Sequence, residues 1–191
     1  MRLVLASRNP HKVRELGPLL APNELVPLPD HVTLPPENGR TFAENALGKA
    51  RAASAATGQT AVGDDSGIEA AALGGAPGIR SARYAGEQAT DEENLAKLLA
   101  EVPEDGDNRV AYVCALAMAH PGGKEFVAEG RCEGRLVQDT RGHNGFGYDP
   151  AFVPDDDVAG GRTMAELAPE EKDMISHRGR AARALMERSP E

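Results

Sequence analysis

Two adjacent aspartates, Asp64 and Asp65, stand in the stretch AVGDDSGIEAAALGGAPG, between an apolar run and two glycine-rich turns. Paired carboxylates repel each other, so keeping them side by side is costly without a cation. In an exposed turn, water would screen the repulsion between the two carboxylates. At the end of a strand, a bound metal ion would offset it. If a strand continues through both residues, their side chains point to opposite faces. We expect Asp65, which Ser66 and a glycine follow, to be the one that faces a ligand.

Two glutamates upstream of this pair, Glu37 and Glu44, are candidates to join Asp65 around a cation. Mg²⁺ usually takes one or two protein carboxylates and leaves its other positions to water and substrate phosphates. Glu44 is equally explained as the capping-box partner of Thr41, and Glu37 as a solvated loop residue. The residue types alone do not decide whether either glutamate is a metal ligand or has a structural role.

The segment SRNPHK, residues 7–12, directly follows a short apolar run. A strand that turns at once into a helix presents free backbone N–H groups and the positive end of the helix dipole, which bind anions. Ser7 and Asn9 add donors, and Lys12 reaches a phosphate as a point charge. The alternative is an ordinary capped helix with a surface lysine, because the glycines of a Walker loop are missing.

The motif NGFGYDP, residues 144–150, has the composition of a flat-ligand site. Its glycines let the backbone approach a ring, Phe146 or Tyr148 could stack on that ring, and Asp149 could accept hydrogen bonds from ring N–H groups. A tight aromatic turn that fills the core is the alternative.

The motif EEKDMISHRGRA, residues 170–181, contains several hydrogen-bond donors near the predicted start of a helix. Lys172, His177 and Arg178 could grip a carbonyl or a phosphate, although a helix cap with surface charge has the same composition. No Ser or Cys nucleophile has a sequence context that matches His177, which argues against a triad hydrolase.

The elements that position these motifs follow from apolar periodicity and caps. Residues 3–6 and 60–63 predict short strands, and a further strand is expected near residues 25–28. Two longer runs, 109–120 and 125–137, predict a hairpin turned at Pro121-Gly122-Gly123. Helices are predicted from Pro10 until Gly17-Pro18 ends or kinks the chain, between Thr41 and Gly58, over 91–101, after Thr163 and after Ser176. Strands followed by helices, plus one hairpin, indicate an α/β protein with a mixed sheet, which binds ligands where strands end and helices begin.

The composition bounds the function. A chain of 191 residues with 40% hydrophobic content predicts one globular domain over residues 1–191, with room for two lobes. A net charge of −9 argues against a grip on nucleic acid, although a local basic cluster could hold a small anion. Cys114 and Cys132 lack zinc spacing and are expected to be buried thiols. No signal peptide or membrane span is recognisable, so we expect a cytoplasmic protein.

Each of these signals is common, but their order and spacing are specific. The segments LASRNPHKVREL, ENGRTFAENALGKA, DDSGIEAAALGGAPGIRSARYAG, NGFGYDPAF and MAELAPEEKDMISHRGRA closely resemble the successive motifs of the XTP/dITP pyrophosphatase family, also called inosine triphosphatases. The match covers residues 3–185. Its most distinctive parts are DDSG, LGGAPG and SARY in succession and the late SHR.

This resemblance implies an enzyme that removes non-standard purine nucleoside triphosphates (ITP, dITP and XTP). Such an enzyme splits the α–β phosphate bond and releases the monophosphate and pyrophosphate. The resemblance also implies an elongated mixed sheet flanked by helices, two lobes with a central cleft, a homodimer and a requirement for Mg²⁺.

Residue by residue, the resemblance implies that Asp65 is catalytic and that Glu37 and Asp65 hold the metal, with Glu44 as the alternative to Glu37. The residues that it implies in substrate binding are Ser7, Arg8, Asn9, Pro10, His11, Lys12, Ser66, Phe146, Gly147, Tyr148, Asp149, Lys172, His177 and Arg178. Many members have Thr-Gly-Asn where this chain has Ser7-Arg8-Asn9. The arginine requires an ordinary φ and is expected to add charge at the cleft mouth.

The family's substrates carry a carbonyl at the six-position of the base, whereas adenine carries an amino donor there. Donors around His177 and Arg178 would therefore favour ITP strongly over ATP and less strongly over GTP. Two other classes compete with this prediction. One is a nucleotide-binding regulator without chemistry, and the other is a hydrolase of other modified nucleoside triphosphates.

Overall fold

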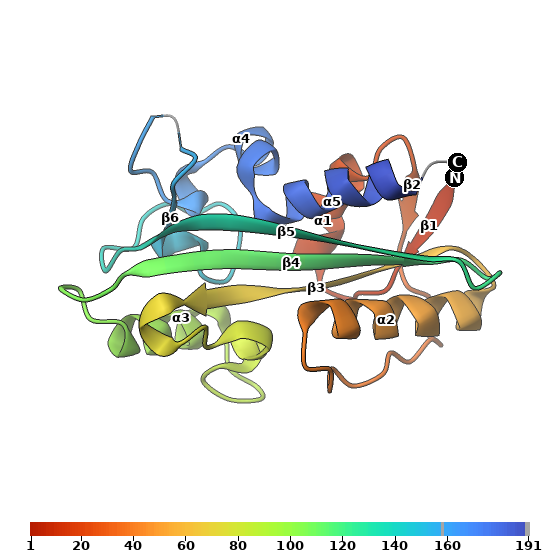
Figure 1. Ribbon diagram of the computed structural model, residues 1–191, viewed down its shortest axis with the longest axis horizontal. Helices are drawn as coiled ribbons and strands as arrows, with labels where there is room; N and C mark the ends of the chain where they lie inside the picture. The colour runs from red at the N-terminus through yellow and green to blue at the C-terminus, as the bar shows by residue number, and fades with distance from the viewer. Residues whose placement is uncertain (158, 190–191) are drawn as a thin grey trace. The chain divides into compact units, whose positions relative to one another are not determined.

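The computed structural model describes residues 1–157 and 159–189, and Figure 1 traces their helices and strands. Six strands form one sheet in the order β2-β1-β3-β4-β5-β6. The strands are β1 (Arg2–Leu5), β2 (Glu24–Val26), β3 (Ala61–Ala70), β4 (Arg109–Ala119), β5 (Glu125–Leu136) and β6 (Phe152–Pro154). Because β1 runs parallel to β2 and β3 whereas β5 runs antiparallel to β6, the sheet is mixed, which confirms the predicted α/β class.

Five α-helices and several short 3₁₀ turns connect these strands in the part of the chain that the structure describes. The helices are α1 (Pro10–Leu19), α2 (Phe42–Thr57), α3 (Asp91–Glu101), α4 (Pro169–Ile175) and α5 (His177–Arg188).

The chain divides into two compact units. The first unit comprises Met1–Asp65, Cys114–Gly130 and the described residues from His177 onward, and the second comprises Ser66–Val113 and the described part of Arg131–Ser176. Each unit has its own hydrophobic clusters. The expectation of a single domain over the whole chain stays a prediction.

In the first unit, helices cover both faces of the sheet, with α2 on one face and α1 and α5 on the other (Figure 1). The alternation along β1 explains this arrangement, because successive side chains of a strand point to opposite faces. Leu3 and Leu5 belong to the cluster that α1 and α5 complete, whereas Val4 packs with Ala53 of α2. These strand residues are at most 1% exposed, so the strand is buried from both sides.

Most of the predicted elements occur where the local signals placed them. Thr41 caps α2 through the backbone N–H of Glu44, and Gly58 ends that helix in the left-handed conformation at φ 64°. Helix α3 has the predicted bounds and a complete capping box at Thr90. Strands β4 and β5 are neighbours joined by the predicted turn, in which the N–H of Gly123 bonds to the carbonyl of His120.

The structure revises two of the predicted boundaries. Helix α1 includes Pro18 and ends only after Leu19, because a proline in the last turn leaves few hydrogen bonds to break. Strand β3 does not stop at residue 63 but continues to Ala70, so the aspartate pair lies inside a strand and not at its end. Lys172 precedes α5 and also lies within α4, a short helix that Pro169 starts and that the sequence did not predict.

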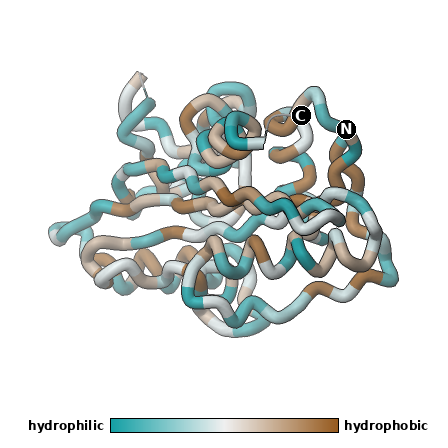
Figure 2. Tube along the Cα trace, turned by 45° about the vertical axis from the view of Figure 1, so that its right-hand side comes forward, coloured by the Kyte–Doolittle hydropathy of each residue, from teal (hydrophilic) through white to brown (hydrophobic). Residues whose placement is uncertain are grey.

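Hydrophobic and hydrophilic residues alternate over short stretches of the chain in Figure 2. None of the helices that the structure describes is long and apolar enough to cross a membrane. Cys114 and Cys132 are buried free thiols, as predicted.

Candidate functional site

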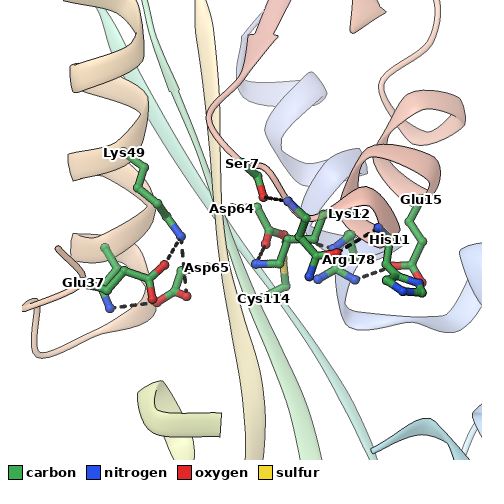
Figure 3. Close-up of polar contacts among 12 residues, drawn as sticks. Ser7, His11, Lys12, Glu15, Glu37, Lys49, Asp64, Asp65, Cys114 and Arg178 are labelled. Carbon is green, nitrogen blue, oxygen red and sulfur yellow. Dashed lines mark hydrogen bonds and ion pairs between the residues drawn. The ribbon is translucent and has the colours of Figure 1, made fainter. Parts of the chain in front are cut away.

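Strand β3 sends its two aspartates to opposite faces of the sheet (Figure 3). Asp65 faces the side that α2 covers, and Asp64 faces the side that carries α1 and α5. A close approach of α2 to the strand makes the first arrangement possible. A Cβ added at Gly63 would lie 2.0 Å from the backbone oxygen of Ala46, so only glycine lets this helix come so near. The spacing rule for strands therefore selects one aspartate for each face.

Asp65 is 5% exposed and lies among polar side chains. Its carboxylate accepts a hydrogen bond of 2.9 Å from the side-chain amide of Asn45 and lies 3.8 Å from the ammonium of Lys49. The same ammonium forms an ion pair with Glu37 (Figure 3). Burial raises the pKa of Asp65, Lys49 offsets part of this rise, and the negative charge of Glu37 adds to it. On the side of the sheet that α2 covers, the carboxylates of Asp65 and Glu37 therefore lie near the same ammonium, that of Lys49.

Asp64 is fully buried on the other face, where two cations meet it. Lys12 pairs with one carboxylate oxygen, and the Nε of Arg178 donates to the other at 3.0 Å. The thiol of Cys114 donates to that second oxygen as well, at 3.3 Å. Burial alone would raise the pKa of Asp64, but the charges of Arg178 and Lys12 outweigh burial and hold this pKa well below its usual range. Asp64 is therefore ionised and neutralised inside the protein.

The segment of residues 7–12 links β1 to α1 and supplies Lys12 to this pair. Asn9 caps the helix by accepting from the N–H of His11 at 2.9 Å, and Ser7 accepts from the N–H of Asn9 at 3.2 Å. Pro10 occupies the first helical turn, as predicted, because its missing N–H needs no partner there. Arg8 has no positive φ, and its guanidinium contacts the backbone of residues 29–32.

Helix α5 begins with His177 and Arg178, both buried. The helix approaches β5 closely, since a Cβ added at Gly130 would lie 2.1 Å from the backbone oxygen of His177. The guanidinium of Arg178 also pairs with Glu15 of α1, so it joins two helices to the strand. The sequence predicted donors at these positions, and the structure places the guanidinium among carboxylates in the interior.

The second unit holds the other predicted residues. Asp149, 2% exposed, accepts from the N–H of Phe146 at 2.9 Å and from the ammonium of Lys172 at 2.7 Å. The ammonium of Lys172 lies 5.5 Å from the centroid of the half-buried Phe146 ring. Tyr148 is a core residue whose hydroxyl donates to the carbonyl of Ser81. Between the two alternatives for this motif, the structure therefore assigns Tyr148 to the core and leaves Phe146 at the edge of the turn.

Several site residues were missed by sequence reasoning. Asn45 and Lys49 stand four positions apart on α2 and so share one helix face, a spacing that could have revealed them. Glu15 follows Lys12 by three positions on α1 and has the same kind of local signal. For Cys114, which lies in the middle of an apolar strand, the sequence offers no signal.

The donors around Lys49 fit a magnesium ion. The carboxylates of Glu37 and Asp65 both form ion pairs with the ammonium of Lys49, so the two side chains point toward the same cation. Within residues 1–157 and 159–189, no group of three or more His, Cys, Asp and Glu side chains gathers as a metal cluster. The protein would therefore supply two carboxylates and leave the remaining positions to water and phosphate, as is usual for Mg²⁺. The carboxylate of Glu44 accepts instead from the N–H of Arg40 at 2.6 Å.

The fold and these charge clusters define an α/β protein with acidic side chains on both faces of one strand. The family model described as "Ham1 family" matches residues 3–188. The dITP/XTP pyrophosphatase of Corynebacterium glutamicum (strain R) is 46% identical over 198 residues, which cover 98% of this chain and 96% of that protein. The protein of the same name from Symbiobacterium thermophilum is 50% identical, with coverages of 99% and 95%.

Solved structures lead to the same family. The structure of a HAM1 protein from Coxiella burnetii superposes with a TM-score of 0.83 at 41% identity, and the match covers 96% of this chain and 95% of that one. The Ham1 protein of Staphylococcus aureus gives the same TM-score and coverages at 38% identity. The chain belongs to the Ham1 family.

Proposed function

We propose that this protein hydrolyses non-standard purine nucleoside triphosphates, ITP, dITP and XTP, to the monophosphate and pyrophosphate. Relatives at 46–50% identity over nearly the whole chain are named dITP/XTP pyrophosphatases. The observation that carries the proposal is that the carboxylates of Asp65 and Glu37 lie beside the same ammonium, that of Lys49, where a divalent ion would use both of them. A nucleotide-binding regulator without chemistry has no need for this pair.

The residues of the first unit provide for the phosphate end of the reaction. Asp65 and Glu37 would hold Mg²⁺, which when bound polarises phosphate oxygens and lowers the pKa of water. Asp65 lies at the proposed metal site, so its carboxylate would be in place to accept a hydrogen bond from the attacking water. It would take the proton of the water that attacks the α-phosphorus, while the bond to the β-phosphate breaks and pyrophosphate leaves. Ser7 to Lys12 would bind the triphosphate through main-chain and side-chain donors.

The base would be recognised by donors and acceptors from the other predicted motifs. His177 and Arg178 at the start of α5, and the turn of Phe146, Gly147 and Asp149 with Lys172, are the residues that we assign to it. Ser66 follows Asp65 directly on β3 and is assigned to the substrate as well. The assignment of Tyr148 is limited to its backbone, because its ring and hydroxyl are committed to the core. A homodimer is the expected assembly.

The direct test is pyrophosphate release by the purified protein from ITP, dITP, XTP, ATP and GTP, with and without Mg²⁺. We expect rapid release from the first three, dependence on Mg²⁺, and little release from ATP. The Asp65→Asn variant is the matched control, because it keeps the size of the side chain and an acceptor for Asn45. Binding of ITP without release of pyrophosphate would favour the regulator, and a preference for another modified nucleotide would favour the rival hydrolase class.

Selectivity tests the base assignment separately. A buried donor that faces the amino group of adenine loses its partner, at a cost of about 1–3 kcal/mol for each group. For one such group, we therefore expect kcat/KM for ITP to exceed that for ATP by about fivefold to 150-fold. Equal turnover of the two nucleotides would contradict the recognition of the six-position.

A further inference from the structure

Arg8 stands between two residues of the predicted phosphate loop, yet its side chain binds another part of the backbone. Its Nη2 donates to the carbonyl of Val32 at 2.9 Å and to that of Asp30 at 3.1 Å, and it lies 3.5 Å from that of Pro29. The carboxylate of Asp30 is 3.5 Å from Nη1 but fully exposed, so this ion pair adds little. A planar guanidinium suits several carbonyls at once, which an ammonium does not.

The segment that Arg8 holds leads directly to Glu37. Its start is fixed by Arg8 and by Val32, which is 3% exposed and packs in the core. Its end is fixed by α2, because the N–H of Gly39 donates to the side-chain oxygen of Asn45 at 2.8 Å. Asn45 in turn donates to Asp65. Glu37 therefore lies between two fixed points of the chain. One is the contact with Asn45, which also binds Asp65, and the other is the contact with Arg8.

We propose that Arg8 is a positioning residue that ties the phosphate loop to the segment of Glu37 and so prepares the two-carboxylate metal site. This inference rests on the proposed function and deepens it. A loop that is already ordered loses less conformational freedom when its carboxylate takes a ligand, so affinity rises without a new contact. Removing the guanidinium frees residues 29–32 while the anchor at Gly39 stays.

A second explanation makes a different prediction. If Arg8 acted only as a positive charge toward the triphosphate, then lysine would replace it and the KM for the nucleotide would carry the effect. The Arg8 side chain is 52% exposed, so its substitution by lysine distinguishes a charge toward a ligand from hydrogen bonds to the carbonyls.

The experiment compares Arg8→Ala and Arg8→Lys with the wild type and with Arg2→Ala, which removes another exposed arginine that pairs with Glu24. The first readout is amide hydrogen exchange without metal or nucleotide. The N–H of Val32 bonds to the carbonyl of Pro29 at 3.0 Å, so it reports on the held turn. We expect its exchange to accelerate about tenfold or more in Arg8→Ala, less in Arg8→Lys and not in Arg2→Ala, while the N–H of Gly39 keeps its rate.

The second readout is the Mg²⁺ concentration that gives half of the metal-dependent rise in Tm, and half of the maximal pyrophosphate release from ITP. For Arg8→Ala we expect both concentrations to rise about threefold to tenfold, as for other residues that orient metal ligands.

Unchanged exchange at Val32 would overturn the inference whatever the activity. Faster exchange with an unchanged Mg²⁺ requirement in the Tm measurement would overturn the link to the metal site. A KM effect that lysine rescues would identify Arg8 as a charge for the triphosphate. Absence of pyrophosphate release in the wild type would overturn the proposed function alone, because exchange and the Tm measurement do not depend on turnover.

Discussion

Asp64 and Asp65 are neighbours in the chain, but β3 places them in opposite electrostatic surroundings. On one face, Asp64 and Glu15 meet Lys12 and Arg178, so two carboxylates face two cations in the ion pairs described above. On the other face, the carboxylates of Asp65 and Glu37 both form ion pairs with the ammonium of Lys49. The pKa of Asp64 is accordingly far below its ordinary value, whereas burial raises that of Asp65.

This difference in surroundings indicates that the carboxylate of Asp64 stabilises the fold, whereas that of Asp65 takes part in the proposed reaction. The negative charge of Asp64 is matched inside the protein and joins α1 and α5 to the sheet. On the other face, Asp65 and Glu37 both lie beside Lys49, where we propose that a further cation binds. Two identical side chains acquire different roles because of the helix that covers each of them.

The largest effect is expected from Asp64→Asn. The change keeps the shape but leaves Lys12 and Arg178 without their shared partner in the interior. Breaking a buried pair in this way costs about 3–5 kcal/mol of unfolding free energy. Urea unfolding at pH 7 measures this loss, and Asp107→Asn, at an exposed pair with Arg109, is the control that should change little. If Asp64→Asn were as stable as the wild type, the structural role of Asp64 would be wrong.

The counterpart Asp65→Asn should spare stability and remove activity. Loss of a positioned proton acceptor lowers kcat by about 10²–10⁴-fold. The fold should remain intact, because asparagine still accepts from Asn45 and a buried charge has been removed. Pyrophosphate release and urea unfolding of the same preparation test both statements. Full activity of Asp65→Asn would exclude this carboxylate from the chemistry.

A smaller effect distinguishes the two glutamates. Glu37→Gln should raise the Mg²⁺ requirement of ITP hydrolysis about tenfold or more, since one of two metal carboxylates is lost. Glu44→Gln should leave that requirement unchanged, because the Glu44 side chain accepts from the backbone N–H of Arg40. The reverse result would make Glu44 the metal ligand.

The smallest effect is a difference in pH dependence. The depressed pKa of Asp64 contributes stability above its ordinary value of 3.8, and this stability is lost as the pH falls through the folded-state pKa. The gap between the wild type and Asp64→Asn should therefore narrow below pH 4. The raised pKa of Asp65 has the opposite sign, because its contribution is present below 3.8 and is lost as the pH rises through the folded-state value.

Unfolding of the three proteins at several pH values in metal-free buffer measures both trends. The wild type should lose stability relative to Asp65→Asn as the pH rises above 3.8. Relative to Asp64→Asn, it should gain stability as the pH rises toward 3.8 and keep that gain at higher pH. Parallel curves for the two variants would mean that the two faces of β3 do not differ in the way the ion pairs indicate.

Much of the fold was set by signals between near neighbours in the sequence. The caps at Thr41 and Thr90, the stop at Gly58 and the turn between β4 and β5 depend on residues within a few positions of each other. Apolar periodicity gave the strands, and the rule of alternation correctly separated Asp64 from Asp65. The end of β3 was missed because pairing with neighbouring strands, and not composition, carried it through GDDSG to Ala70.

The sequence by itself thus determined the elements, the family resemblance and the choice of Asp65 as the acidic residue of interest. Only the tertiary structure decided which cations meet the carboxylates. Arg178 reaches Asp64 across 114 positions and Glu15 across 163, and Arg8 reaches Val32 across 24. Such contacts depend on how closely helices approach the sheet, at Gly63 and Gly130 above all, and this packing is a property of the whole folded chain.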